Sequence, residues 1–214
     1  AEAIEAAADR LRAGEQVAIK GIGGSHLACD ATDPEAVETL RERTGRPTKP
    51  FALMAPDLDT IESFADVSDA EREALETVRR PIVLLEQSAD GSTENWLDEI
   101  APGLHTVGVM LPYSGLHHRL FDHVDGPLVM TSANLPGRPM ATTKDAILTR
   151  LGDVIDAALV HDRDIVARSD DSVVRFSGGE RRFIRRSRGW VPEELPLPGG
   201  APEIDAELDT RGSE

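Results

Sequence analysis

The stretch VAIKGIGG, residues 17–24, joins a short apolar segment to a glycine-rich turn. Its first three residues predict a buried β-strand, and Lys20, Gly21, Gly23 and Gly24 follow within the next five positions. Glycines at this density let a backbone turn sharply and approach a ligand closely. Backbone N–H groups with a lysine beside them could hold a small anion. A tight strand-to-loop turn carrying a surface lysine would explain the same residues equally well.

The glycine turn matches neither of two standard nucleotide-binding signatures. It does not end in Gly-Lys-Ser/Thr as a P-loop does, and His26 stands at the third glycine position of the dinucleotide fingerprint. The turn therefore favours phosphate or another small anion, held by a fold other than these two.

Strands and helices alternate along the chain around this turn, which predicts an α/β fold. Asp33-Pro34 predicts the start of one helix, and Ser68 with Glu71 predicts a capping box at the start of another. Further helices are expected over residues 1–13, 114–123 and 144–151, and the second helix should run to about residue 43. Strands are expected over residues 17–19, 51–54, 81–85, 106–111, 127–130 and 157–160.

The last part of the chain changes character. Residues 172–176 and 181–187 read as two strands of a hairpin, which makes the predicted sheet mixed and not purely parallel. Prolines, glycines and acidic residues dominate after that. We expect one domain over residues 1–191 and a tail or linker over residues 192–214.

Composition narrows the class of protein. The 214 residues suffice for one sizeable core, and Cys29 is the single cysteine, which rules out an intrachain disulfide. No apolar run approaches the roughly 20 residues of a membrane helix. No secretory signal pattern opens the sequence. These features predict a cytoplasmic protein without a membrane partner.

The chain is strongly acidic, with a net charge of −16, and its 23 basic residues comprise three lysines and twenty arginines. An acidic surface poor in lysine is what we expect of a salt-adapted (halophilic) protein, because dense salt screens the self-repulsion. An acidic face for a basic partner is the alternative. Acidity of this degree disfavours a broad nucleic-acid footprint, although five arginines gather within residues 181–188.

Two polar clusters are candidates for binding a nucleotide. Arg46 and Lys49 alternate with prolines in RPTKP, which holds two cations in defined positions suited to a triphosphate. Thr131, Ser132 and Asn134 follow a predicted buried strand, and ligands of α/β proteins usually bind at such strand ends. A solvated proline turn and an Asx turn, respectively, are the simpler explanations.

Two further clusters could involve a metal ion. Asp170 and Asp171 could hold Mg²⁺ through water or orient an arginine, or form a solvated acidic loop. His117, His118 and Asp122 outline part of a metal site, but no third ligand has convincing spacing, which favours a structural role. We therefore predict no metal site built from protein ligands alone.

Taken in order, these segments resemble one family, the YrdC-type domain of the HypF carbamoyltransferases. The resemblance spans roughly residues 4–197. The matching segments are Ala18–Ala31 (AIKGIGGSHLACDA), Leu40–Met54 (LRERTGRPTKPFALM), Pro81–Leu85, Val109–His118, Val129–Pro139 (VMTSANLPGRP), His161–Arg175 and Ile184–Pro192 (IRRSRGWVP).

The resemblance implies a twisted mixed sheet flanked by helices, with a deep basic cleft. It implies that ATP with Mg²⁺ and carbamate form carbamoyl-adenylate and pyrophosphate. In the family's full-length members, the carbamoyl group then passes to the partner HypE during maturation of NiFe-hydrogenase.

The resemblance also carries over residue roles. Lys20, Arg46 and Lys49 match positions that act on the reacting groups, and Lys20 with Gly21, Gly23 and Gly24 matches the substrate loop. The nucleotide positions are matched by Arg46, Lys49, Thr131, Ser132, Asn134, Ser172 and Arg185, with Arg186 and Arg188 as rivals for the last of these.

The chain departs from the family pattern at three positions. Thr44 stands where a lysine is usual, Ser25 where an aromatic is usual, and Gly115 where a proline is common. Two other functions remain open at this point. A threonylcarbamoyl-adenylate synthase for tRNA modification would carry Pro-Thr where this chain has Lys20-Gly21. A double-stranded RNA-binding module of the same fold is disfavoured by the acidic composition.

Overall fold

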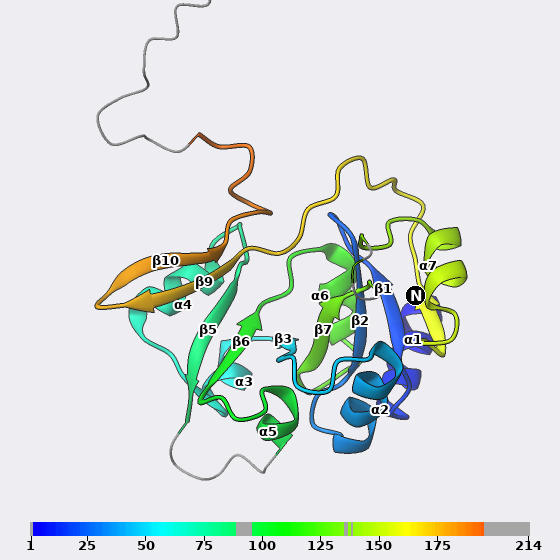
Figure 1. Ribbon diagram of the computed structural model, residues 1–214, viewed down its shortest axis with the longest axis horizontal. Coiled ribbons are helices and arrows are strands. Elements are labelled where there is room, and N and C mark those ends of the chain that lie inside the picture. Colours follow the sequence, from blue (N-terminus) through cyan, green and yellow to red (C-terminus); the bar gives the residue numbers. More distant parts are fainter. Residues whose placement is uncertain (1, 89–95, 135–136, 138, 195–214) are drawn as a thin grey trace, which may run out of the picture.

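The protein, seen here as a computed structural model, is described over residues 2–88, 96–134, 137 and 139–194. The predicted tail therefore lies outside the described residues, apart from positions 192–194. Figure 1 shows a strongly twisted sheet with helices packed around it. The strands are β1 Val17–Lys20, β2 Ser25–Asp30, β3 Ala52–Met54, β4 Ala65–Asp66, β5 Ile82–Gln87, β6 Thr106–Met110, β7 Leu128–Ser132, β8 Ala157–Leu159, β9 Val173–Ser177 and β10 Glu180–Arg185.

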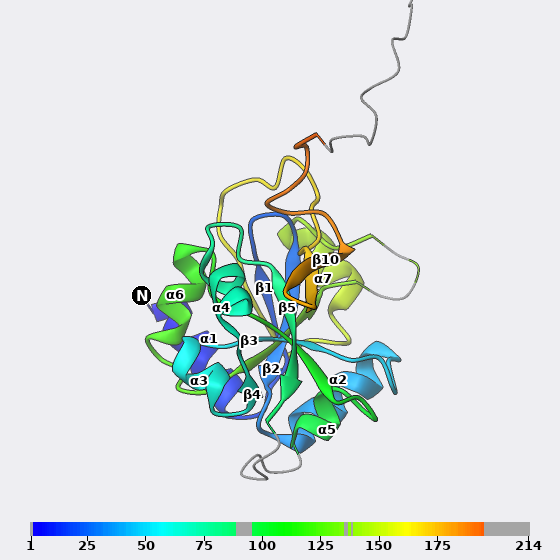
Figure 2. The ribbon, with the colours of Figure 1, turned by 90° about the vertical axis from the view of Figure 1, so that its left-hand side faces the viewer.

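Helices occur on both sides of the strands (Figure 2). They are α1 Glu2–Arg12, α2 Pro34–Thr44, α3 Leu58–Glu62, α4 Asp69–Glu76, α5 Trp96–Ile100, α6 Gly115–Phe121 and α7 Lys144–Leu151. All five helices expected from the sequence are present. The short α3 and α5 were not predicted, because five residues give too little hydrophobic periodicity to read.

The sheet is mixed, as the sequence predicts. Its ten strands run in the order β10-β9-β5-β6-β3-β7-β2-β1-β8, with β4 added beside β5 among the described residues. The pairs β1–β8, β3–β6 and β5–β9 are parallel, whereas the others, including the β9–β10 hairpin, are antiparallel. Strands from the two ends of the chain thus share one sheet, and the C-terminal hairpin extends it beyond β5.

Local signals at the helix ends explain where two of the helices begin. The Asp33 carboxylate accepts hydrogen bonds from the backbone N–H groups of Glu35 and Ala36, at 3.0 and 3.3 Å, and Pro34 is the first residue of α2. Gly45 ends α2 in the left-handed conformation with φ 62°. The capping box of Ser68 and Glu71 is present at the start of α4, which confirms that prediction.

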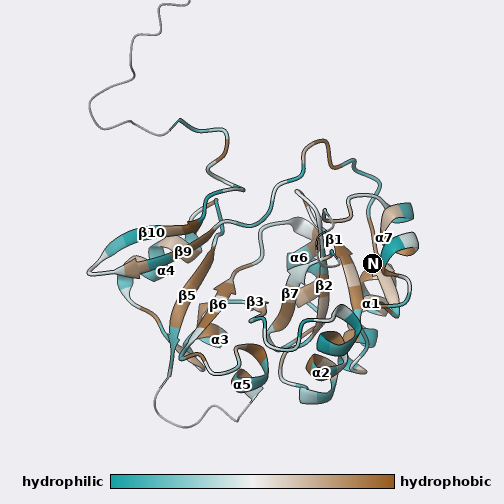
Figure 3. Ribbon diagram, in the orientation of Figure 1, coloured by the Kyte–Doolittle hydropathy of each residue, from teal (hydrophilic) through white to brown (hydrophobic). Residues whose placement is uncertain are grey.

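The buried side chains form two apolar clusters, and Figure 3 shows hydrophobic residues concentrated along the strands. One cluster joins the sheet to α2, α5 and α7 through residues such as Leu40, Ile100 and Ile147. The other joins it to α1 and α6 through residues such as Leu11 and Leu120. At about 25 cal/mol per Å² of buried apolar surface, these clusters are the main source of stability.

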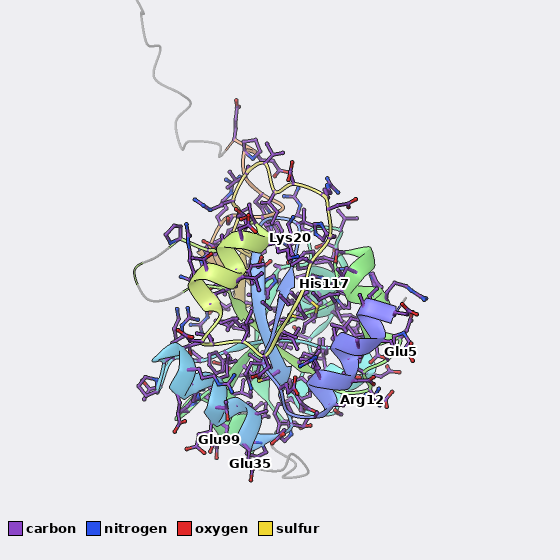
Figure 4. All side chains as sticks on the ribbon, turned by 90° about the vertical axis from the view of Figure 1, so that its right-hand side faces the viewer. Glu5, Arg12, Lys20, Glu35, Glu99 and His117 are labelled. Atoms are coloured by element: carbon purple, nitrogen blue, oxygen red, sulfur yellow. The ribbon has the colours of Figure 1, made fainter. Side chains whose placement is uncertain are left out.

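Several acidic residues face outward. Figure 4 shows Glu5, Arg12, Glu35 and Glu99 at the periphery, whereas Lys20 and His117 lie toward the interior. The interpretation of this acidic surface as salt adaptation stays a prediction. Within the described residues, no helix combines the length and apolarity that crossing a bilayer requires.

Candidate functional site

A cavity of about 240 Å³ opens at the end of β7, between the two halves of the sheet. We call it the strand-end cavity. Its volume is below the roughly 300–1,000 Å³ of pockets that enclose small ligands, so a nucleotide would be only partly enclosed. It is lined by His26, Lys49, Pro50, Phe51, Ala52, Ile82, Leu84, Gly108, Met130, Thr131, Ser132, Met140, Asp170, Asp171, Val173 and Arg185.

Two cations, Lys49 and Arg185, line this cavity from opposite walls. Lys49 precedes β3, and Arg185 is the last residue of β10. The pKa of Lys49 is lowered, first by partial burial and then by the positive charges of Arg46 and Arg185, while Asp170 opposes the shift. When two cations repel each other across a cavity, an anion that binds between them relieves this repulsion. The walls therefore favour a polyanion such as a phosphate chain.

Arg46 does not line the cavity but supports its polar edge from behind. Its guanidinium donates to Thr131 Oγ1 at 2.9 Å and to the backbone and side-chain oxygens of Asn134 at 2.9 and 3.0 Å. The Ser132 hydroxyl donates to the same Asn134 Oδ1 at 2.7 Å. Burial lowers the pKa of Arg46, which is 6 % exposed. One buried cation thus orders the three polar residues at the end of β7.

Arg41 fixes the backbone of the basic segment, a role that the sequence analysis missed. Its guanidinium lies 4.4 Å from the centre of the Phe51 ring and donates to the carbonyls of Arg46 and Lys49 at 2.9 and 2.8 Å. It also donates to the carbonyls of Glu99 and Ile100 in α5. An arginine in the last turn of a helix usually lies on the surface, so no pattern distinguishes this one.

A buried ionic cluster closes one end of the cavity. Asp171 Oδ2 lies 2.8 Å from His26 Nε2, and Asp171 Oδ1 accepts from Arg188 at 2.8 Å. Burial alone would raise the pKa of Asp171, but the charges and hydrogen bonds of His26 and Arg188 outweigh it, so the pKa lies below its usual range. Arg188 also donates to the carbonyls of Arg79 and Arg80 and covers the face of Tyr113 at 3.7 Å.

The structure does not bring Lys20 to the strand-end cavity. Its Nζ donates to the carbonyls of His161 and Arg163, at 3.1 and 2.7 Å, and the residue is 5 % exposed. His161 Nε2 in turn lies 3.2 Å from the carbonyl oxygen of Gly21. The lysine therefore ties the loop at residues 161–163 to the glycine turn.

The glycines of the turn allow close packing. A Cβ on Gly23 would lie 2.5 Å from the carbonyl oxygen of Ser169, and a Cβ on Gly24 would collide with the side chain of Met140. Gly21 N–H donates to the carbonyl of Gly24 at 2.8 Å, so this N–H is engaged within the turn. Two neighbouring segments therefore pack against Gly23 and Gly24, whereas Ile22 in the same turn is exposed.

Ser172 and the three rival arginines take different positions relative to the strand-end cavity. The Ser172 hydroxyl, fully buried, accepts from Ser187 N–H at 2.8 Å and donates to the Arg188 carbonyl at 2.9 Å. It shapes the wall without lining the cavity. Arg186 donates to the carbonyl of Glu193. Of the three rival arginines, Arg185 alone is among the described residues that line the cavity.

Four other positions named in the sequence analysis do not line the strand-end cavity: Thr44, His117, His118 and Asp122. The Thr44 hydroxyl is 2.6 Å from the Leu40 carbonyl inside α2, and Thr44 is 2 % exposed. His117 is fully buried and His118 is exposed, while Asp122 pairs with Arg119 at 2.7 Å. Among the described residues, no group of three or more potential ligands could hold a metal ion.

Comparisons with known proteins place the chain in a family. The Sua5_yciO_yrdC family, described as telomere recombination, matches residues 9–187. The chain therefore belongs to the YrdC/Sua5 family of α/β domains. Within it, the chain is closely related to the YrdC domain of HypF carbamoyltransferases, at 45–50 % identity.

Individual relatives make this relation specific. Carbamoyltransferase HypF of Rhodobacter capsulatus is 50 % identical over 208 residues, which cover 96 % of this chain and 27 % of the relative. The crystal structure of T. kodakarensis HypF superposes with a TM-score of 0.85 at 50 % identity, covering 91 % of this chain and 25 % of that one. Full-length HypF in its phosphate- and nucleotide-bound form gives 0.83 at 45 % identity, with coverages of 88 % and 29 %. The chain thus spans about a quarter of the length of these relatives.

Proposed function

We propose that this chain forms carbamoyl-adenylate from ATP and carbamate and releases pyrophosphate, as one step of carbamoyl transfer in NiFe-hydrogenase maturation. The observation that carries the proposal is the pair of facing cations, Lys49 and Arg185, beside the polar end of β7. A close relative of this chain has been solved with phosphate and nucleotide bound. Because the match covers only about a quarter of the relatives' length, we assign transfer to a HypE-type acceptor to the parts of those proteins that lie outside the match.

The reaction makes one bond and breaks one. A carbamate oxygen attacks the α-phosphorus of ATP, and the bond from that phosphorus to the bridging oxygen of the leaving pyrophosphate breaks. Carbamate is already an anion, so the attack needs no general base. Lys49 and Arg185 would bind the phosphate chain and stabilise the charge that develops on pyrophosphate. Thr131 and Ser132, ordered through Arg46 and Asn134, would orient the nucleotide at the end of β7.

The residues present fit Mg²⁺ carried by the nucleotide. Mg²⁺ in such sites is usually held by one or two carboxylates together with substrate phosphates and water. Both oxygens of Asp171 are engaged by His26 and Arg188, which leaves Asp170 as the carboxylate of this pair available in the cavity. When bound, the ion would neutralise charge between the phosphates.

The function is tested by measuring pyrophosphate release from ATP in two reactions. One contains carbamoyl phosphate with an added acylphosphatase, which supplies carbamate, and the other contains bicarbonate and threonine. We expect faster release in the first. A higher rate with threonine would instead assign the activity of threonylcarbamoyl-AMP synthase, whose Vibrio campbellii representative is 27 % identical over 154 residues. Binding of double-stranded RNA without release in either reaction would favour the RNA-binding alternative.

Replacing Lys49 with alanine is expected to weaken ATP binding by about tenfold to a hundredfold. The lost charge-assisted contact contributes roughly 1.5–3 kcal/mol. Calorimetric titration with ATP and Mg²⁺ measures the change. Lys144→Ala is the matched control, since Lys144 is exposed at the start of α7 and does not line the cavity. Equal affinities in the two variants would refute the placement of the phosphates beside Lys49.

A further inference from the structure

Two histidines from distant parts of the sequence meet beside the strand-end cavity. His26 lies on β2 and His117 on α6, and their ring centroids are 6.3 Å apart. Tyr113 stands next to both rings, with centroids 4.5 Å from His117 and 6.4 Å from His26. The three rings form one polar cluster between sheet and helix, in which both histidines are buried and Tyr113 is partly exposed.

The cluster contains hydrogen-bonding atoms that the protein leaves unused. His117 is fully buried, and neither of its ring nitrogens has a partner among the described residues. His26 Nδ1 is also buried and without a partner there. Buried polar atoms of native proteins are almost always hydrogen-bonded, to protein, water or ligand. Three such atoms in adjacent rings would therefore be partnered by water or by a bound polar molecule.

The orientation of His26 is set from its other side. Asp171, held by Arg188, is an ionised carboxylate and can only accept, so His26 Nε2 carries the proton that it shares with Asp171. His117 is neutral near pH 7, because burial and then the neighbouring His26 lower its pKa to about 3. A neutral imidazole offers one donor and one acceptor. The cluster suits a small molecule that both donates and accepts.

The cluster is also in the right place for a reacting group. His26 and Ser132 are paired directly across β2 and β7, so their side chains share one face of the sheet. His26 lines the strand-end cavity together with Lys49 and Arg185. A second cavity of about 420 Å³, beside the glycine turn, is lined by Tyr113. His26 thus lies where a small molecule could approach a nucleotide held at the end of β7, and the fully buried His117 lies behind it without lining either cavity.

We propose that the His26 end of the strand-end cavity, with His117 behind it, binds the one-carbon substrate, a carboxyl compound with both donor and acceptor groups such as carbamate or bicarbonate. This inference rests on the proposed function and moves the substrate from the side chain of Lys20 to the two histidines. The amino or hydroxyl group of the molecule faces the imidazoles, and its negative charge faces Lys49 and Arg185.

The proposal is tested with His117→Phe, which keeps a ring and removes both nitrogens. Pyrophosphate release is measured while carbamoyl phosphate, with added acylphosphatase, is varied. We expect the apparent KM for the carbamate source to rise about tenfold, while the affinity for ATP measured by calorimetry stays within about twofold of the parent chain. His118→Phe is the matched control, because His118 is the next residue of α6 and is exposed. This control should change neither quantity.

A second readout does not depend on turnover. Imidazole ¹⁵N resonances are recorded while ammonium carbamate or sodium bicarbonate is added, and the signal absent from His117→Phe identifies His117. A shift with carbamate alone, or with both anions, supports the site and distinguishes the two sources. No shift with either anion overturns it, even if ATP still binds.

Loss of ATP binding in His117→Phe would point to a damaged fold, and His117→Gln, which keeps a donor and an acceptor, then decides. In His117→Gln, an ATP affinity and a KM for the carbamate source near those of the parent chain, with an unchanged response of the His26 resonances, would support the hydrogen-bonding role. Wild-type-like KM in a well-folded His117→Phe protein would contradict it. Absence of pyrophosphate release by the parent chain would count against the proposed function. The imidazole shifts would still test whether carbamate or bicarbonate binds at the two histidines.

Discussion

The Arg188→Met protein is expected to be less stable than the parent chain by about 3–5 kcal/mol. Arg188 is 13 % exposed and Asp171 is 10 % exposed, so removing the arginine leaves a buried carboxylate with His26 as its remaining side-chain partner. Loss of one partner from a buried ion pair costs this much because the other charge stays desolvated. Urea unfolding followed by tryptophan fluorescence measures the change in the free energy of unfolding.

Arg182→Met is the control for this measurement. Arg182 forms an exposed pair with Glu180, in which the side chains are 64 % and 70 % exposed, so its loss should cost less than about 1 kcal/mol. Equal losses in the two variants would contradict the role of the buried cluster.

The pH dependence of the free energy of unfolding has a defined sign. Because the folded pKa of Asp171 is depressed, its contribution is complete above about pH 4 and is lost as the pH falls further.

Replacing Arg41 with alanine is expected to destabilise the protein by at least about 3 kcal/mol and to weaken ATP binding. The change removes charged donors from the carbonyls of Arg46, Lys49, Glu99 and Ile100, and each such bond contributes roughly 1.5–3 kcal/mol, without full additivity. Without that anchor, Lys49 has more conformations to lose on binding. Thermal unfolding and calorimetry with ATP measure the two effects.

Arg43→Ala separates this effect from a general loss of charge on α2. Arg43 is on the same helix, and its pair with Asp156 is about one-third exposed on each side. We expect it to cost about 1 kcal/mol or less and to leave ATP binding unchanged. An Arg41→Ala protein that binds ATP like the Arg43→Ala protein would show that Lys49 needs no fixed backbone.

The elements with strong local signals could be predicted from the sequence. Asp33-Pro34 and the pair Ser68 and Glu71 place their helices correctly, because caps act within one helical turn. The strand β2, Ser25–Asp30, was missed because its sequence mixes polar and apolar residues and follows a glycine run. Its polar members are nevertheless buried, since neighbouring strands and the cavity supply their partners.

Single basic residues of the candidate site could be picked out from the sequence, because a cation by itself suggests a contact with phosphate. Lys49 and Arg185 both line the cavity, and each belongs to a segment whose basic residues stand out in the sequence. Asp171, His26 and Arg188 were not assigned to one cluster, since 145 residues separate the first two and only the fold joins them. Of the two roles considered for the Asp170–Asp171 pair, Asp171 orients an arginine.

The walls of the strand-end cavity come from opposite ends of the chain, and this sets when the site can appear during synthesis. The wall containing β2 and β7 is complete once residue 132 has been translated. The facing wall needs β9 and β10, and the link between the walls needs Asp171 and Arg188. A nascent chain can therefore fold much of its sheet while still attached to the ribosome and have no intact strand-end cavity. Polypeptides released before about residue 188 would lack Arg188, and with it the link between the two walls, so they are expected to carry only one wall of the strand-end cavity.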